Sequence, residues 1–284
     1  MSSSRSTLVF LSWYVAIIGV CIVAALTMHS FEPEEMRALS LSTWEVFYDV
    51  LGIIYAIVVG FILAELLGRF SDLKTLISKE LNNLECIRDL LIYVDENRDA
   101  KENILAALRA YATSISDVEW ASLRRIAIKN GAQKARSEES DTNERLYALM
   151  RAVETIRCID ESDRLVLGQI IAKIADVTVF RTQRYESSSS SLSPILKYLV
   201  VFLSFVLIVG IILAYVPSII VHLFMIVAMT TAVFLLYAVI TDLNNPYAGI
   251  WRIDPTPFSE LAKTLTLAHY EMHDQAADDA IPSD

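Results

Sequence analysis

Glycine, proline and cysteine are scarce in this chain of 284 residues, with 8, 7 and 3 copies respectively. With 54% apolar residues, so few glycines and prolines indicate a helical membrane protein and not a barrel or a disordered chain. The three cysteines, at positions 21, 86 and 158, are too widely spaced for a disulfide framework or a zinc motif. The net charge of −10 comes without any basic stripe, so we expect no nucleic-acid partner.

Catalytic motifs are also missing from the sequence. It contains no glycine-rich phosphate loop, no HExxH and no GxSxG. His269 and His273 stand four residues apart and in principle could hold a metal, but they lie in an acidic tail with no partner motif. We therefore expect neither an enzyme nor a cofactor or metal site.

The longest absence is that of charge between residues 198 and 241, where 44 residues include no Asp, Glu, Lys or Arg. A helical membrane crossing needs about 20 apolar residues, so this run has room for two. Pro217, near its middle, supplies the turn signal. The pattern predicts a transmembrane hairpin within residues 194–241.

Two further apolar stretches lie near the N-terminus. Residues 8–28 carry no charge, and a full-length span is favoured over a signal peptide, whose apolar core is about 7–15 residues long. Residues 46–68 hold Asp49 and Glu65 near their ends, with 15 uncharged residues between them. We predict four spans and an all-α membrane protein with a cytoplasmic helical bundle.

The charges beside these spans predict their orientation. The loop between the first two spans is rich in glutamate, at positions 32, 34, 35 and 45. Basic residues flank the other membrane ends, namely Arg5, Arg69, Lys74, Arg181, Arg184 and Lys197. Because cationic flanks stay in the cytoplasm, we expect both termini, the helical domain of residues 70–193 and the segment 242–284 inside, in a cell (inner) membrane.

The middle of the chain reads as a bundle of helices. An apolar stripe with steps of three and four residues runs from Leu73 to Leu91, interrupted only by Glu80. No proline separates it from the second span, so the two should form one rod. We expect further helices over residues 99–129, from residue 141 and after residue 162. Residues 134–141 should be a charged loop and the serines at 187–191 a hinge.

Residues 242–258 read DLNNPYAGIWRIDPTPF. With Asp242, Pro246, Gly249, Pro257 and Phe258, this stretch resembles the signature that closes the bestrophin-like family of four-span bacterial membrane proteins. Two other stretches agree: Glu80 to Leu84 with Arg88 after the second span, and Arg184 followed by Pro194 before the third. Tyr247 stands where phenylalanine is usual, and the outer loop is unusually acidic.

This resemblance implies a homo-oligomer, with five subunits around a central pore for permeant ions and the second span of each lining its narrow part. It also implies an ion channel that conducts anions. A ring of Arg69 would favour anions, whereas a ring of Glu65 and the acidic outer loop would favour cations, so the residues alone leave selectivity open.

Helical periodicity separates two faces of the second span. Small residues recur every four positions on one face, at Gly52, Ala56, Gly60 and Ala64, a spacing that lets helices pack closely. The other face carries Ile54, Val58 and Ile62, which we predict to form an apolar constriction, with Glu65 and Arg69 at its mouth. In the alternative, the isoleucine face meets lipid and Glu65 pairs with Arg69.

Asp49 and Glu65 lie about 24 Å apart along the helix, less than the roughly 30 Å of the hydrocarbon core. At least one carboxylate is therefore shallow in the membrane and should face water or a partner, which favours the pore. The alternative function is a membrane-anchored helical scaffold or signalling protein without a pore. The number of copies in the assembly distinguishes the two.

Overall fold

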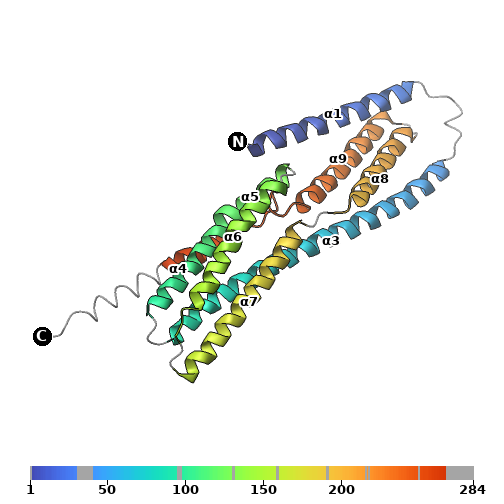
Figure 1. Ribbon diagram of the computed structural model, residues 1–284. Helices are drawn as coiled ribbons and strands as arrows, with labels where there is room; N and C mark the ends of the chain where they lie inside the picture. The colour runs from blue at the N-terminus through green and yellow to red at the C-terminus, as the bar shows by residue number, and fades with distance from the viewer. Residues whose placement is uncertain are drawn as a thin grey trace. The chain divides into compact units, whose positions relative to one another are not determined.

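The computed structural model describes residues 2–30, 41–94, 98–129, 132–157, 160–189, 192–214, 216, 218–248 and 250–266 (Figure 1). Every regular element among these residues is a helix, as the sequence predicts. The glutamates of the outer loop at positions 32, 34 and 35, together with Pro217, Gly249, His269 and His273, lie outside the described residues.

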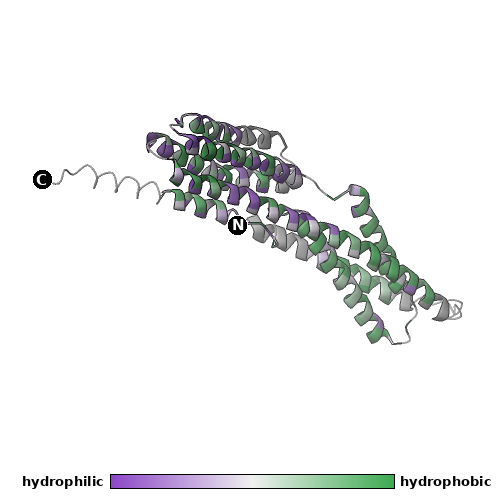
Figure 2. Cartoon of the chain, turned by 90° about the horizontal axis from the view of Figure 1, so that it is seen from below, coloured by the Kyte–Doolittle hydropathy of each residue, from purple (hydrophilic) through white to green (hydrophobic). Residues whose placement is uncertain are grey.

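The described chain forms two compact units, which we name unit 1 and unit 2. Unit 1 comprises residues 1–68 and 192–244, and unit 2 comprises residues 69–191 and 245–284. Hydropathy differs sharply between them: green, apolar residues dominate the helices of unit 1, and purple, polar residues gather on those of unit 2 (Figure 2).

Unit 1 contains α1 (Ser2–Ser30), the first part of α3 (Leu41–Leu90), α8 (Pro194–Leu213) and α9 (Ile219–Leu243). The charge-free run thus forms the predicted helical hairpin. Among the described residues, three helices are long and apolar enough to cross a membrane: Val46–Tyr93, Pro194–Leu213 and Ile219–Leu243. Within α1 the apolar stretch Ser12–Thr27 is shorter, so a fourth crossing stays a prediction.

Unit 2 contains the rest of α3, the 3₁₀ turn η1 (Leu91–Tyr93) and the helices that follow it. These are α4 (Arg98–Ser114), the π-helical turn η2 (Ile115–Glu119), α5 (Trp120–Lys129), α6 (Ala132–Val153) and α7 (Glu161–Ser189). Residues 256–266 form one more helix. The 50 residues of α3 confirm the predicted rod.

Three sequence expectations about these helices need correction. Residues 134–141 are not a loop, because α6 begins at Ala132; alanine, lysine, glutamine and glutamate favour helix even where charge is dense. Helix α7 begins at Glu161 because the carboxylate of Asp160 accepts a hydrogen bond from the backbone of Asp163 at 2.7 Å and caps the helix. The expected serine hinge is helical as far as Ser189.

Candidate functional site

One face of α3 in unit 1 is buried inside the chain's own core. Tyr55, Val59, Ile62 and Leu66 are at most 8% exposed and recur at steps of four, three and four residues. They pack with apolar side chains of α8 and α9, and Ser204 of α8 donates a hydrogen bond to the Tyr55 hydroxyl at 3.3 Å. This packing decides which face of α3 remains open.

The three residues predicted for the constriction do not share one environment. Ile54 is 45% exposed, Val58 is half-buried, and Ile62 is only 3% exposed. Periodicity gave the correct angular spacing but not which way the helix faces its neighbours. Ile62 contacts the chain's own core, so this placement does not support it as a pore-lining residue. The constriction itself stays a prediction.

The small residues of α3 lie on its open side. Ala56, Gly60 and Ala64 are exposed and Gly52 is half-buried, and a side-chain carbon added at either glycine would meet nothing within 4 Å. A packing role for this row would therefore need a neighbouring chain and stays a prediction. Within unit 1 the close approach is instead at Gly210, where an added carbon would lie 3.1 Å from the Tyr48 hydroxyl.

The two residues predicted for the pore mouth are both accessible. Glu65 is exposed and Arg69 is half-buried, and each interacts with other groups of the chain. Neither is an isolated charge. Their role at a pore mouth stays a prediction.

A second row of α3 is exposed along most of its length and carries no charge. Its members recur at alternating steps of four and three residues, as the buried row does, and all are exposed: Ile57, Phe61, Ala64, Gly68, Ser71, Thr75, Ser78 and Asn82. Up to Gly68 the row is apolar or small; from Ser71 it is small and polar. Charged residues such as Asp72, Lys74 and Lys79 stand beside it.

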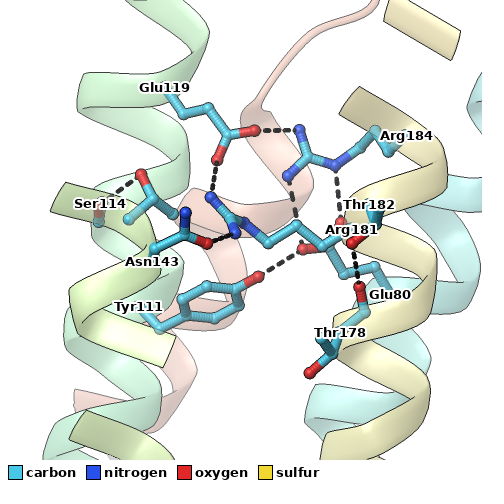
Figure 3. Close-up of polar contacts among 10 residues, drawn as sticks. Glu80, Tyr111, Ser114, Glu119, Asn143, Thr178, Arg181, Thr182 and Arg184 are labelled. Carbon is cyan, nitrogen blue, oxygen red and sulfur yellow. Dashed lines mark hydrogen bonds and ion pairs between the residues drawn. The ribbon is translucent and has the colours of Figure 1, made fainter. Parts of the chain in front are cut away.

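Unit 2 holds a cluster of buried charges, which we name the ionic cluster: Glu80, Glu119, Arg181 and Arg184 (Figure 3). Arg184 Nε lies 2.7 Å from Glu80 Oε2, and Arg184 Nη1 lies 2.7 Å from Glu119 Oε1. Arg181 Nη2 lies 3.8 Å from Glu119 Oε2. Two arginines and two glutamates balance each other, which keeps the buried charge neutral.

Neutral donors and acceptors complete the ionic cluster. The Tyr111 hydroxyl donates to Glu80 Oε1 at 2.8 Å, and Arg181 donates a hydrogen bond to the Asn143 side-chain oxygen. The π-helical turn η2 ends at Glu119 and inserts an extra residue per turn there, which changes the direction in which the following side chains point. The cluster joins α3, α4, η2, α6 and α7 (Figure 3).

Electrostatics in the ionic cluster follow from burial and pairing. Burial alone would lower the pKa of Arg184, but the carboxylates of Glu119 and Glu80 outweigh it and hold that pKa well above its ordinary value. Burial, with the adjacent Glu80 carboxylate, raises the pKa of the Tyr111 hydroxyl well above its ordinary value, against the opposing effect of the arginines. Both groups therefore keep their protons throughout the neutral range.

The signature segment of the sequence packs beside this cluster. Phe258 is fully buried and Tyr247 is 3% exposed, and both rings contact Trp120, at centroid distances of 5.8 and 5.4 Å. The guanidinium of Arg184 lies 5.5 Å from the Trp120 ring, and the indole N–H donates to the Ile253 carbonyl at 3.1 Å. These contacts attach residues 247–258 to α5 and α7.

The remaining described residues of the signature lie in or beside the loop that follows α9. Asp242 and Pro246 are half-buried, Pro257 is exposed, and the carbonyl of Pro246 accepts from the backbone of Ile253 at 2.8 Å. Pro246 thus closes the loop that follows α9. Asn244 ends α9 with a right-handed backbone, and its side-chain oxygen accepts from the backbone of Leu192 at 2.8 Å.

Sequence reasoning did not identify the ionic cluster, although a signal was present. Glu80 interrupts the apolar stripe of α3, and Arg181 and Arg184 continue the apolar spacing of Ile174 and Val177 on α7. Ionisable residues on apolar faces of two helices indicate a buried ion pair. In the described part of the chain, no three His, Cys, Asp or Glu side chains gather as metal ligands.

Comparison with known proteins gives the family. A profile of the bestrophin-like domain matches residues 15–258. A solved structure of a bacterial bestrophin homologue from Klebsiella pneumoniae matches with a TM-score of 0.70 and 14% identity, covering 92% of this chain and 98% of that one. A point mutant of the Klebsiella homologue gives a TM-score of 0.69 and the same identity and coverage.

No curated protein sequence matches the chain. At 14% identity the structural likeness establishes the fold alone, whereas the family profile covers part of the first predicted span, the helical middle and the other three predicted spans. A protein of this family with helices of this apolar length is embedded in a membrane. The chain belongs to the bestrophin-like family.

Proposed function

We propose that this protein is a homo-oligomeric ion channel, with five copies around an axis and the exposed uncharged row of α3 facing that axis. The row continues past Gly68 into the stretch from Ser71 to Asn82, where the helix is no longer apolar enough for lipid to cover it. The solvent face of a surface helix carries charged and polar residues, whereas all eight exposed positions of this row are uncharged and charges stand only beside it. This row is the observation that carries the proposal.

The apolar residues Ile57 and Phe61 of this row, with Ile53 one turn before it, form the proposed constriction. Ile53, Ile57 and Phe61 are 60, 53 and 74% exposed and lie four residues apart, opposite the buried face of α3. A ring of such side chains excludes water when narrow and conducts when it is wetted. The proposed neck therefore consists of these three residues, in place of Ile54, Val58 and Ile62, and the polar residues beyond it line a wider water path.

The small residues fit the same arrangement. Ala56 and Gly60 lie next to the proposed neck residues, and a neighbouring copy of α3 that packs on them would come within close helix-packing distance. We propose the orientation that the charges favour, with both termini and unit 2 in the cytoplasm of a cell with an inner membrane. Anion conduction is the selectivity that the family resemblance favours.

Recordings from planar bilayers test the proposal. Replacing Phe61 by alanine should raise single-channel conductance severalfold, because the neck widens. The matched control is Phe224→Ala on α9, where a phenylalanine of similar exposure, 73%, should leave conductance unchanged. Reversal potentials in a KCl gradient should shift toward the chloride equilibrium potential. A monodisperse monomer without currents would support the scaffold instead.

A further inference from the structure

A small cavity in unit 1 lies where α8 begins and α9 ends. Its volume is about 120 Å³, the space of about four water molecules at roughly 30 Å³ each. Leu192, Val200 and Ile240 are buried and supply its apolar walls, and Lys197 and Thr241 supply polar groups. It is large enough for one tetrahedral anionic group and too small for a nucleotide.

The polar groups of this cavity can donate more hydrogen bonds than the chain uses. The side chain of Lys197 makes no ion pair or hydrogen bond with any residue in the described part of the chain, and only its backbone N–H donates, to the Ser193 carbonyl at 3.3 Å. The side-chain oxygen of Asn244 is occupied by the backbone N–H of Leu192, which leaves its amide N–H groups for another acceptor. Asp242 is not among the residues that line the cavity.

The cavity lies at the boundary of the apolar run. Lys197 is the last charge before the 44 uncharged residues, and Thr241 is the last residue of that run. This is the depth at which the phosphate groups of a bilayer meet its hydrocarbon. One and two turns along α8 from Lys197, Val201 and Phe205 are 49 and 63% exposed, an apolar surface for an acyl chain.

We propose that this cavity binds the headgroup phosphate of an anionic phospholipid. Lys197 pairs with the phosphate, the Asn244 amide donates to it, and an acyl chain runs along Val201 and Phe205. A free phosphate shares the charge but cannot use the apolar surface, so the lipid is the occupant. The proposal does not depend on ion conduction, since it requires only that α8 and α9 lie in a membrane.

Lipid titration of the delipidated full-length protein, followed by native mass spectrometry, tests this site. Phosphatidylglycerol should bind more tightly than zwitterionic phosphatidylcholine of the same acyl composition. Lys197→Gln should weaken phosphatidylglycerol binding about fivefold, the effect of about one interfacial lysine. Lys197→Arg should retain phosphatidylglycerol binding. Lys263→Gln, which removes an exposed lysine in unit 2, should leave phosphatidylglycerol binding unchanged.

A second variant makes the test independent of charge. Thr241→Leu, on an exposed position of α9, should fill the cavity and weaken binding of phosphatidylglycerol without changing the oligomer's mass. Equal affinity of the wild-type protein and Lys197→Gln for phosphatidylglycerol would overturn the proposal. So would inorganic phosphate that competes fully for the site, or a change in oligomer mass with Lys197→Gln, because a second copy would then cover the cavity.

Discussion

Buried polar side chains are of different kinds in the two units. Among the residues whose burial is described, those of unit 1 are Ser204, His222 and Thr230, with no Asp, Glu, Lys or Arg. His222 interacts with the Ile211 carbonyl at 2.9 Å, and Ser204 with Tyr55. Unit 2 instead buries two arginines and two glutamates in one cluster.

The difference in buried polar groups follows from the surroundings of each unit. A charge inside an apolar bundle in a bilayer cannot be hydrated and is costly to bury. The buried polar groups of unit 1 are therefore neutral and interact through single hydrogen bonds. In unit 2 the charges pair and hydrogen-bond with one another, which limits the desolvation cost, and their directionality fixes which faces of α3, α4 and α7 meet. The two units thus specify the same helix, α3, by different means.

Removing one charge from the ionic cluster should have the largest effect. Arg184→Met takes the partner from two buried carboxylates, Glu80 and Glu119, and should destabilise the protein by about 3–5 kcal/mol. The thermal unfolding midpoint in detergent measures this. The matched control is Arg164→Met, which removes an exposed arginine from the same helix and should cost less than about 0.5 kcal/mol. If Arg184→Met lowered the unfolding midpoint no more than Arg164→Met does, the ionic cluster would not be needed for stability.

A matched pair on α3 tests unit 1 in the same way. Ile62→Ala opens a cavity in the core and should destabilise the protein by about 2–5 kcal/mol, with little direct effect on conductance. Ile57 is exposed and lies five positions earlier. Ile57→Ala should leave the unfolding free energy unchanged and raise the single-channel conductance. If Ile62→Ala raised conductance in a stable protein, the proposed direction of α3 would be wrong.

A smaller loss of stability is expected when Tyr111, which donates to the ionic cluster, is replaced. Tyr111→Phe removes the donor to Glu80 Oε1 without changing the shape of the ring. Glu80 Oε1 then keeps only the long hydrogen bond from Arg184 Nη2 at 3.5 Å, and this loss inside a buried cluster should cost about 1–3 kcal/mol in unfolding free energy. Tyr147→Phe, at an exposed tyrosine of α6, serves as the control and should leave the midpoint unchanged.

The same tyrosine predicts a weak dependence on alkaline pH. Its folded pKa is raised, so the proton is held more tightly in the folded than in the unfolded protein. Its contribution to stability is therefore complete below about pH 10, the unfolded pKa, and is lost as pH rises further. Unfolding midpoints between pH 9 and 11 should fall less in Tyr111→Phe than in the wild-type protein. Parallel curves would exclude this contribution.

The sequence predicts the long elements well and their contacts poorly. The charge-free run and the stripe from Leu73 to Leu91 reflect local periodicity, and both became the expected helices. Which face of α3 is buried depends on contacts with α8 and α9, which lie about 140 residues or more away in the sequence. The periodicity of α3 alone therefore could not predict that Ile62 is buried. The pairing of Glu80 with Arg184 likewise joins residues 104 positions apart.

Two local features also escaped the sequence pattern. The π-helical turn Ile115–Glu119 leaves no signature in residue type, because it inserts one residue into an otherwise ordinary helical stretch. The charged start of α6 reads as a loop by polarity alone, although its residues are good helix formers. Composition therefore gave the fold class, and only tertiary packing gave the site.

Water access along the exposed row of α3 tests the central claim most directly. In a background without the three native cysteines, Thr75→Cys should react with a charged, water-soluble thiol reagent and change the single-channel current. Asn103→Cys, at a position of α4 that is also exposed, should react without changing the current. Modification of Thr75→Cys that leaves the current of a conducting protein unaltered would contradict a pore along this face.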